Sequence, residues 1–509
     1  MSRFYLTTAI DYSNGDPHIG HAYEKIGADA IARYRRLRGD DVHFLIGMDE
    51  HGQKVAQAAE QRGLTPQQQV DEIALRFEAM WTKLGISHDQ FMRTTAEAHK
   101  AAVRELIETI FARNPDDFYE KSYAGHYCVG CESFKADAEI VDGKCILHPT
   151  RTLEWVEERN WFFRLSKYQP FLEKLFRDKP GFLAPESRRN EILGLLKQGL
   201  EDISASRSRF SWGVPFPRPT SDGEAQTTYV WFDALPNYWT ATKVPGSGAR
   251  WPAQLHVVGK DITRFHTVIW PAMLEAAGLP LPDKVWGHGF IYLGGERFSK
   301  SAAVKLELDE AIDRFGPDPF RFYLVREVPW ESDGNFSWER FAELYNAELA
   351  NGLGNLASRV LAMIEKYREG RIPAATLADL ETVGARAVAR YAERMDALDL
   401  KGGVEAALEL VTAANLAIQH AAPWALAKDP AKSGELDQVL GGLARSLVRL
   451  AVMFTPVMPV KAGELWTALG RPGAIPVGGW GSALDPLAAG GVVRKPEGLF
   501  PRPESGVNS

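Results

Sequence analysis

The chain has 509 residues, of which 45% are hydrophobic and 25% charged, and its net charge is −7 at pH 7. This length exceeds what one hydrophobic core supports, so roughly two to four domains are expected. The net charge argues against a protein that coats nucleic acid, although a local basic face is sufficient to bind RNA. No apolar run is long enough to span a membrane, and the first residues lack a signal-peptide pattern. A cytoplasmic protein without a membrane partner is expected.

The N-terminal region has the pattern of a parallel α/β unit. Residues 4–10 have the composition of a buried strand, residues 14–17 that of a turn, and residues 21–38 have helical spacing. A second apolar strand, residues 42–47, follows and ends in Asp49. A strand, a helix and a strand in this order are typical of a doubly wound sheet. The fold class expected is therefore α/β, with a Rossmann-type catalytic domain.

Residues 116–220 differ in character from what precedes them and indicate an insertion. They contain all three cysteines, in a Cys-x2-Cys and a Cys-x2-His pair formed by Cys128, Cys131, Cys145 and His148. Three thiolates and one imidazole suit tetrahedral Zn²⁺, and four protein ligands leave no open position for catalysis. The sequence predicts one structural zinc ion; three reduced, buried cysteines are the alternative.

Further along the chain, residues 227–232 and 255–258 read as strands, and a helix is expected after Asp261. A role as N-cap of this helix is the alternative to a ligand contact for Asp261, and the two roles can coexist. Residues 290–293 and 296–298 flank two glycines and predict a tight hairpin. Beyond about residue 340 the pattern is helical, with leucines at three- and four-residue steps between positions 436 and 454. The segment from Arg471 is rich in proline and glycine and is expected to be extended.

Two short motifs carry most of the chemical information. The segment His18-Ile19-Gly20-His21 stands at the expected start of a helix, where free amide groups and the helix dipole attract phosphate. The segment Arg297-Phe298-Ser299-Lys300-Ser301 follows the hairpin, and its Lys300 could stabilise the charge that develops as pyrophosphate leaves. Taken alone, each is equally a polar helix start or a solvated loop. Together they indicate a site that binds ATP from both sides for nucleotidyl transfer.

These motifs resemble the HIGH and KMSKS signatures of class I aminoacyl-tRNA synthetases. Segments 12–14, 49–52, 229–234, 259–262 and 324–333 resemble the methionyl-tRNA synthetases, in order over about residues 4–470. The resemblance implies a catalytic domain in residues 1–115 and 221–290, split by the connective insertion 116–220 with its zinc knuckle. It further implies a linking segment 291–345 with the lysine loop, a helical anticodon-binding domain 346–470 and a C-terminal tail 471–509.

The resemblance also assigns roles to residues. The methionine pocket is expected to comprise Ala9, Ile10, Tyr12, Asp49, Trp231, Ala234, Tyr238, Ile262 and His266, with Asp49 holding the amino group. The ATP-binding residues are expected to be His18, Gly20, His21, Gly259, Asp261 and Lys300. His18, His21, Asp49 and Lys300 are the expected catalytic residues. Arg207 resembles an arginine near the substrate through a looser match. On the residues alone, 229–233 is equally a core strand.

In the helical region, Asn355, Arg359 and Trp424 match positions that read the anticodon. Asn355 and Arg359 are one helical turn apart, and Trp424 could stack on an unpaired base. An ordinary packed tryptophan and a polar helix face are the alternative reading of the same residues.

The implied reaction joins L-methionine to the 3′ end of tRNA(Met) by way of methionyl-adenylate, with ATP as substrate, Mg²⁺ accompanying ATP, and a monomeric enzyme. The chain departs from the family at Arg297-Phe298, where Lys-Met is usual, and at Ala302-Ala303-Val304, where a glycine is usual. Two alternatives remain open: another adenylyltransferase of the class I type, and a non-catalytic paralogue that binds tRNA or zinc.

Overall fold

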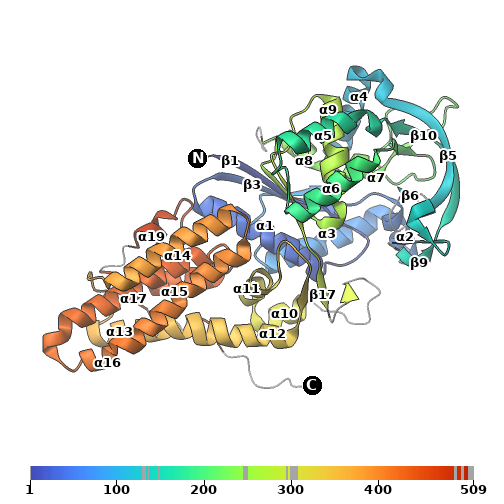
Figure 1. The fold of residues 1–509 in the computed structure, drawn as a ribbon. Helices are drawn as coiled ribbons and strands as arrows, with labels where there is room; N and C mark the ends of the chain where they lie inside the picture. The colour runs from blue at the N-terminus through green and yellow to red at the C-terminus, as the bar shows by residue number, and fades with distance from the viewer. Residues whose placement is uncertain are drawn as a thin grey trace.

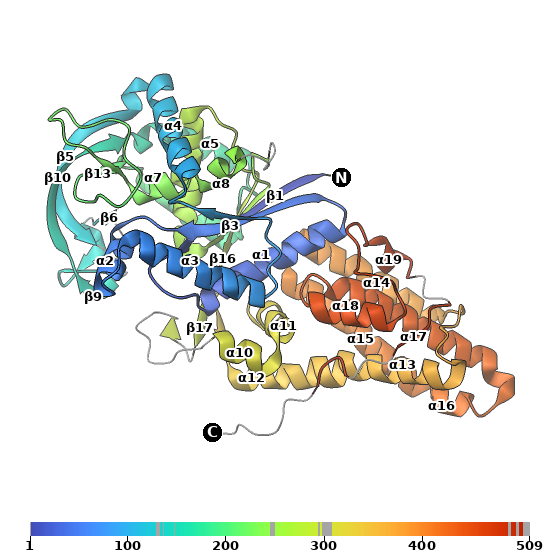
Figure 2. The same cartoon turned by 180° about the vertical axis from the view of Figure 1, so that it is seen from behind.

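The computed structural model describes residues 2–128, 133–135, 137–146, 148–244, 250–293, 296–297, 308–486, 490–494 and 498–501. Figure 1 shows an α/β body at one end of the molecule and an elongated bundle of helices at the other. Helices α10 (Leu308–Phe315), α11 (Pro317–Glu327) and α12 (Trp338–Leu344) lie between the two parts, and the same arrangement is seen from behind in Figure 2.

The body is built on a seven-stranded sheet in which every pairing is parallel. Its order is β11-β16-β15-β1-β3-β2, with β4 also paired to β3; the strands are β11 (Leu183–Ala184), β16 (Val285–His288), β15 (Leu255–Gly259), β1 (Arg3–Thr8), β3 (Asp41–Asp49), β2 (Asp11–Tyr12) and β4 (Gln90–Arg93). In this sheet β1 lies between β3 and β15, so the strand that follows on one side of β1 comes early in the sequence and the strand on its other side comes late. Such a reversal is where open α/β sheets bind ligands, at the carboxyl ends of the strands.

Helix α1 (Ile19–Leu37) follows β1 and β2 and confirms the helical spacing seen in the sequence. His18 is its N-cap, and the Nδ1 atom of His18 accepts a hydrogen bond from the Gly20 amide at 3.1 Å. The Nδ1 atom of His21 accepts one from the His18 amide at 3.2 Å, which completes a capping box made of two histidines. The motif is therefore also what starts the helix.

The insertion is dominated by two long antiparallel strands, β5 (Phe118–Cys128) and β10 (Glu154–Phe163), which curve around the outside of the body (Figure 1). Strands β6 (Ser133–Phe134) and β12 (Ile203–Ser204) extend this sheet, and β7 (Ile140–Val141), β8 (Lys144–Cys145) and β9 (His148–Thr152) form a small separate one. Helices α5 (Gln169–Asp178) and α6 (Glu186–Gln198) then lead back to the parallel sheet.

The bundle contains α13 (Asn355–Arg368), α14 (Ala378–Asp396), α15 (Leu400–Ala421), α17 (Ser433–Phe454) and α18 (Pro459–Ala468). The leucine spacing correctly predicts α17, because those leucines are buried along its length. The segment after Arg471 is not merely extended. It forms a short helix, α19 (Gly481–Leu484), and Trp480 is buried against Tyr34 of α1 at a ring distance of 5.9 Å.

Two further local predictions are wrong. Residues 227–232 were expected to form one strand. Of these, only Thr227–Thr228 is a strand (β14), and Val230–Ala234 forms the helix α7. All five α7 residues are buried, and a short, continuously apolar run has no periodicity that separates a helix from a strand. Asp261 is not a helix N-cap; it lies inside the 3₁₀ turn η5 (Lys260–Ile262), which Gly259 precedes.

A buried ion pair joins the sheet domain to the helical region. The Nη2 atom of Arg321 on α11 lies 2.6 Å from Oδ2 of Asp29 on α1, and neither side chain is exposed. Arg321 also donates to the carbonyl oxygens of Pro456 and Val457, at 3.0 and 2.8 Å. Burial opposes ionisation of Asp29, but the charges of Arg321 and Arg33 outweigh it and lower the pKa to about 2.

Replacing Arg321 with alanine is expected to lower the free energy of unfolding by about 3–5 kcal/mol, because it leaves a buried carboxylate without its partner. The depressed pKa of Asp29 means that its contribution is complete above about pH 4 and is lost as the pH falls toward 2. Chemical denaturation at pH 7 measures the loss, with the exposed Arg340→Ala as control. Equal effects of the two changes would contradict the role given to this pair.

Candidate functional site

A pocket of about 300 Å³ opens at the carboxyl ends of β1, β3 and β15. Tyr12 lies opposite Asp49 in the β2–β3 register, so the short β2 strand holds both side chains at this edge. The pocket brings together all nine residues predicted to bind methionine, and Leu235 is the one addition: its lining is Ala9, Ile10, Tyr12, Asp49, Trp231, Ala234, Leu235, Tyr238, Ile262 and His266.

The floor of this pocket is electrically neutral. Burial lowers the pKa of His266 to about 4, so its imidazole is uncharged at neutral pH. Its Nδ1 faces the carbonyl oxygen of Ile262 at 3.0 Å, which can only accept, so the proton resides on Nδ1. Nε2 therefore accepts from the Tyr238 hydroxyl at 2.7 Å. Trp231 stacks on Phe265 at 3.8 Å and forms an aromatic wall. Such a lining suits an apolar or thioether side chain.

A larger cavity of about 1020 Å³ adjoins the pocket and shares Ala9, Ile10, Tyr12 and Ile262 with it. Its lining also includes the predicted ATP-binding residues His18, Gly20, His21, Gly259 and Asp261. The cavity thus lies at the N-terminus of α1, which favours phosphate.

At Gly20 and Gly259 a side chain would be crowded by residues that line this cavity. A Cβ atom at Gly20 would lie 3.0 Å from the His18 ring, and one at Gly259 would lie 2.8 Å from Oδ1 of Asp261. A larger residue at either position would displace a side chain that lines the cavity.

A buried charge cluster under the cavity was not predicted. The Nζ atom of Lys25 donates to Oδ1 of Asp11 at 2.9 Å and to Oε1 of Glu24 at 2.8 Å, and Nε2 of His288 lies 3.0 Å from the other Glu24 oxygen. Burial raises the pKa of Asp11 to about 7 despite Lys25, whereas Lys25 and His288 outweigh burial and lower the pKa of Glu24. The adjacent Glu24 and Lys25, one turn after His21, are the only sequence signal for this cluster.

A second buried network includes His51, two residues after Asp49 in the chain. Asp233 accepts hydrogen bonds from Nδ1 of His51 at 2.6 Å and from Nε2 of His99 at 2.7 Å. Burial would raise the pKa of Asp233, but the two histidines outweigh it and hold that pKa below its usual value. His51 is thereby fixed at the end of β3, two residues beyond Asp49.

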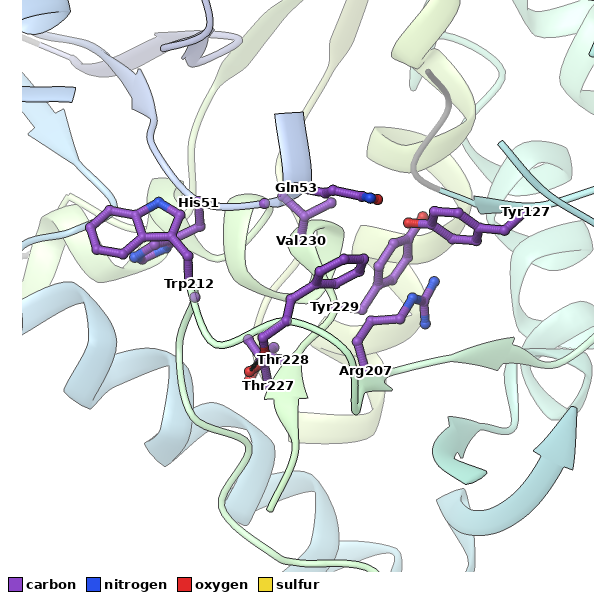
Figure 3. A pocket seen from close by; sticks show the side chains of 12 residues that line it. His51, Gln53, Tyr127, Arg207, Trp212, Thr227, Thr228, Tyr229 and Val230 are labelled. Carbon is purple, nitrogen blue, oxygen red and sulfur yellow. Dashed lines mark hydrogen bonds between the residues drawn. The ribbon is translucent and has the colours of Figure 1, made fainter. Parts of the chain in front are cut away.

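Arg207 does not line the predicted methionine pocket. It lies on β13 (Ser206–Arg207) and lines a neighbouring pocket, where its guanidinium carbon is 4.3 Å from the centre of the Tyr229 ring (Figure 3). That Arg207 lies near the substrate stays a prediction.

Lys300 and residues 298–307 around it lie outside the described residues. The strands that lead to them are described: β17 (Ile291–Leu293) pairs with β18 (Glu296–Arg297), as the hairpin prediction requires, and with β19 (Gly334–Phe336). Phe290 and Ile291, at the start of this hairpin, line the larger cavity. The role of Lys300 stays a prediction.

The predicted zinc ligands are described only in part. Cys128 and Cys145 are buried, whereas Cys131 and the side chain of His148 lie outside the described residues. Cys145 is directly opposite His148 in the β8–β9 pair, and β9 contacts β5, whose last residue is Cys128. Within the described part of the chain, no cluster of three or more potential ligands is assembled.

The three predicted anticodon residues lie on the helical bundle. Asn355 is exposed and Arg359 is half-buried on α13. Trp424, on α16 (Pro423–Leu426), is 47% exposed, so the packed-tryptophan reading is wrong for it. α16 lies at the end of the bundle that is far from the parallel sheet (Figures 1 and 2).

Comparisons with known proteins agree with this geometry. Residues 4–151 and 138–361 match the family model of class I tRNA synthetases (M), and residues 369–505 match the anticodon-binding domain of methionyl tRNA ligase.

None of the helices in the described ranges is long and apolar enough to cross a membrane.

Individual relatives match over almost the whole chain. The methionine–tRNA ligase of Streptomyces coelicolor is 40% identical, over 98% of this chain and 97% of its own, and that of Caldanaerobacter subterraneus is 42% identical, over 98% and 78%. The structure of Mycobacterium tuberculosis methionyl-tRNA synthetase in complex with methionyl-adenylate superposes with a TM-score of 0.92 at 38% identity, over 99% of this chain and 100% of that one. The chain therefore belongs to the methionine–tRNA ligase family of class I tRNA synthetases.

Proposed function

We propose that this chain is a methionine–tRNA ligase that forms methionyl-adenylate from L-methionine and ATP and transfers the methionyl group to the 3′ end of tRNA(Met). The observation that carries the proposal is the methionine pocket, with its neutral floor and the Asp49 carboxylate, beside the larger cavity at the N-terminus of α1. One pocket suits an apolar amino acid and the adjoining cavity suits a nucleotide, so the two substrates would meet at the shared residues Ala9 to Tyr12.

In the first step, Asp49 binds the methionine ammonium group and the Tyr238–His266 floor receives the thioether. The carboxylate attacks the α-phosphate of ATP, and pyrophosphate leaves. His18, His21 and Lys300 stabilise the charge that develops on the phosphates, and Mg²⁺ accompanies ATP. In the second step a ribose hydroxyl of the tRNA terminus attacks the activated carbonyl, and AMP leaves. Positioning and charge stabilisation carry both steps, without a covalent enzyme intermediate.

Charging assays test this proposal directly. With each amino acid supplied alone, the purified chain is expected to acylate tRNA(Met) with methionine far faster than with leucine, valine or cysteine. Faster acylation with any of these three would contradict the methionine assignment. We also propose that the protein is monomeric and cytoplasmic. A molecular mass of twice the chain mass, measured by light scattering, would contradict the monomer.

We propose that Cys128, Cys131, Cys145 and His148 hold one structural zinc ion. The two buried thiols and the Cys145–His148 pairing fit a tetrahedral thiolate–imidazole site, and the ion would crosslink the ends of β5 and β9. Metal analysis of the purified protein is expected to find about one zinc per chain, and Cys145→Ser is expected to lower that ratio well below one. An unchanged zinc content in this variant, or none in the parent protein, would contradict the site.

We propose that Asn355, Arg359 and Trp424 read the anticodon, with Trp424 stacking on an unpaired base. Trp424→Ala is expected to raise the KM for tRNA at least about fivefold, since losing a base stack costs about 1–3 kcal/mol, and to leave pyrophosphate exchange unchanged. Val460→Ala removes another exposed apolar side chain and is the control. A tRNA KM that is the same in both variants would contradict the role of Trp424.

A further inference from the structure

The buried charge cluster under the larger cavity has Lys25 at its centre. Lys25 lies on α1 and is fully buried, and its Nζ atom donates to the carbonyl oxygen of Ala9 at 2.9 Å, to Oδ1 of Asp11 at 2.9 Å and to Oε1 of Glu24 at 2.8 Å. An ammonium group has three N–H donors, so all of them are used. Burial opposes the charge of Lys25, but Asp11 and Glu24 outweigh it and raise the pKa of Lys25, so the group is charged at neutral pH.

Fold stability alone does not explain a charge at this position. Ala22, Ile26 and Ala28, on the same helix, are apolar and equally buried. Removing two ions from water costs about as much as their attraction returns, and well-packed apolar residues in place of a buried ion pair are often as stable or more so. What the ammonium group of Lys25 adds to an apolar side chain is a fixed geometry for the groups that it binds.

Two of the groups that Lys25 binds belong to segment 9–12, which both substrate sites share. Every residue of this segment except Asp11 lines the methionine pocket as well as the larger cavity. The amide of Ala9 donates to the Val257 carbonyl oxygen of β15 at 3.0 Å. The carbonyl oxygen of Ala9 accepts from Lys25 and, at 3.0 Å, from the hydroxyl of the preceding residue. The segment is thus held by the sheet on one side and by Lys25 of α1 on the other.

Strand β2 connects the ion pair of Asp11 to the methionine pocket. In the parallel pairing of β2 with β3, Asp11 lies opposite Met48 and Tyr12 lies opposite Asp49. Successive side chains of a strand point to opposite faces, so Asp11 points toward Lys25 and Tyr12 points away from it. Because β2 consists of these two residues alone, the bond between Asp11 and Lys25 also fixes Tyr12 on the other face.

We propose that Lys25 is a positioning residue for adenylate formation: its ammonium group fixes segment 9–12 so that the methionine carboxylate faces the α-phosphate of ATP. Asp11 and Glu24 line the larger cavity, so one ammonium group joins the walls of both substrate sites. Lys25 lines neither of them and acts through the residues that it binds. This inference rests on the proposed function, because the two substrates meet at this segment only if the chain forms methionyl-adenylate.

The test measures the rate of adenylate formation by stopped flow, normalised to active sites, at saturating methionine and ATP. Lys25→Met nearly keeps the length of the side chain and removes the ammonium group. It is expected to lower the rate at least about tenfold and to change each KM by no more than about threefold, because a small misplacement slows a positioned reaction by up to about 10²-fold. Arg33→Met is the control, since it removes a cation that pairs with Asp29 on the same helix. It is expected to lower the Tm and to leave the normalised rate unchanged.

Two variants of Asp11 decide the question if the Lys25→Met protein does not fold. Asp11→Ala removes one of the three bonds of Lys25 and is expected to lower the normalised rate at least about threefold. Asp11→Asn keeps an acceptor for Lys25. Burial already raises the pKa of Asp11 to about 7, so a neutral side chain suits the site, and this variant is expected to retain the parental rate.

A parental rate in Lys25→Met or in Asp11→Ala would overturn the inference. Equal losses in Asp11→Ala and Asp11→Asn would also overturn it, because the carboxylate would then act on the substrates directly and not through Lys25. A loss in Arg33→Met as large as that in Lys25→Met would leave Lys25 with a structural role only. No adenylate formation in the parent protein would instead contradict the proposed function, so the two failures are distinct.

Discussion

Asp49→Asn is expected to lower kcat/KM for methionine in pyrophosphate exchange by at least about thirtyfold. Asp49 is 3% exposed at the end of β3 and lines the pocket in which the ammonium group would lie. The amide has nearly the same shape but no charge, so the substrate cation would lose its counter-ion. Removing one partner of a buried, hydrogen-bonded charge pair costs about 2–5 kcal/mol.

The loss should fall on methionine, with the KM for ATP nearly unchanged. Asp41→Asn is the matched control, because Asp41 stands at the opposite, exposed end of the same strand and pairs with Arg250. A similar loss for methionine and ATP would indicate a structural role for Asp49, and an unchanged KM for methionine would contradict its binding role.

Lys300→Ala is expected to lower the rate of adenylate formation about 10²–10³-fold while the Kd for methionine stays nearly constant. A lysine that contacts the phosphates mainly when pyrophosphate leaves stabilises the transition state and not the bound amino acid. Stopped-flow adenylation with methionine binding measured separately checks both quantities.

Lys305→Ala is the control for this prediction, since Lys305 lies in the same segment and differs only in position. If Lys305→Ala slows adenylation as much as Lys300→Ala, the charge of the segment as a whole matters and the specific role of Lys300 is wrong. If methionine binding weakens in parallel with the rate, Lys300 acts on the ground state. The same assay measures whether Arg297-Phe298 and Ala302–303 permit a normal rate.

The sequence predicts the fold well wherever periodicity is long. The helical spacing of α1 and α17 extends over enough residues to exclude a strand. The strands β1 and β3 are also predicted correctly, from their apolar composition and the turn and helix between them. The prediction fails at α7, where five buried residues leave no polar face to reveal the period. It also fails for the segment after Arg471, whose packing depends on Trp480 meeting α1 across the molecule.

Less of the candidate site than of the fold can be predicted from local sequence patterns. The nine methionine-pocket residues come from resemblance, because positions as far apart as Ala9 and His266 share no local pattern. Apart from the adjacent Glu24 and Lys25, the contacts of the Lys25 cluster and of the His51–Asp233–His99 network join residues 14 to 264 positions apart, and nothing in the spacing of the chain indicates them.

The central claim is that the pocket and the cavity together activate methionine with ATP. Methionine-dependent exchange of labelled pyrophosphate into ATP, measured with the pure, zinc-loaded protein in the absence of tRNA, tests it most directly. The account predicts rapid exchange with methionine and little with leucine, valine or cysteine. No exchange with any amino acid would contradict it and favour a non-catalytic paralogue that binds tRNA.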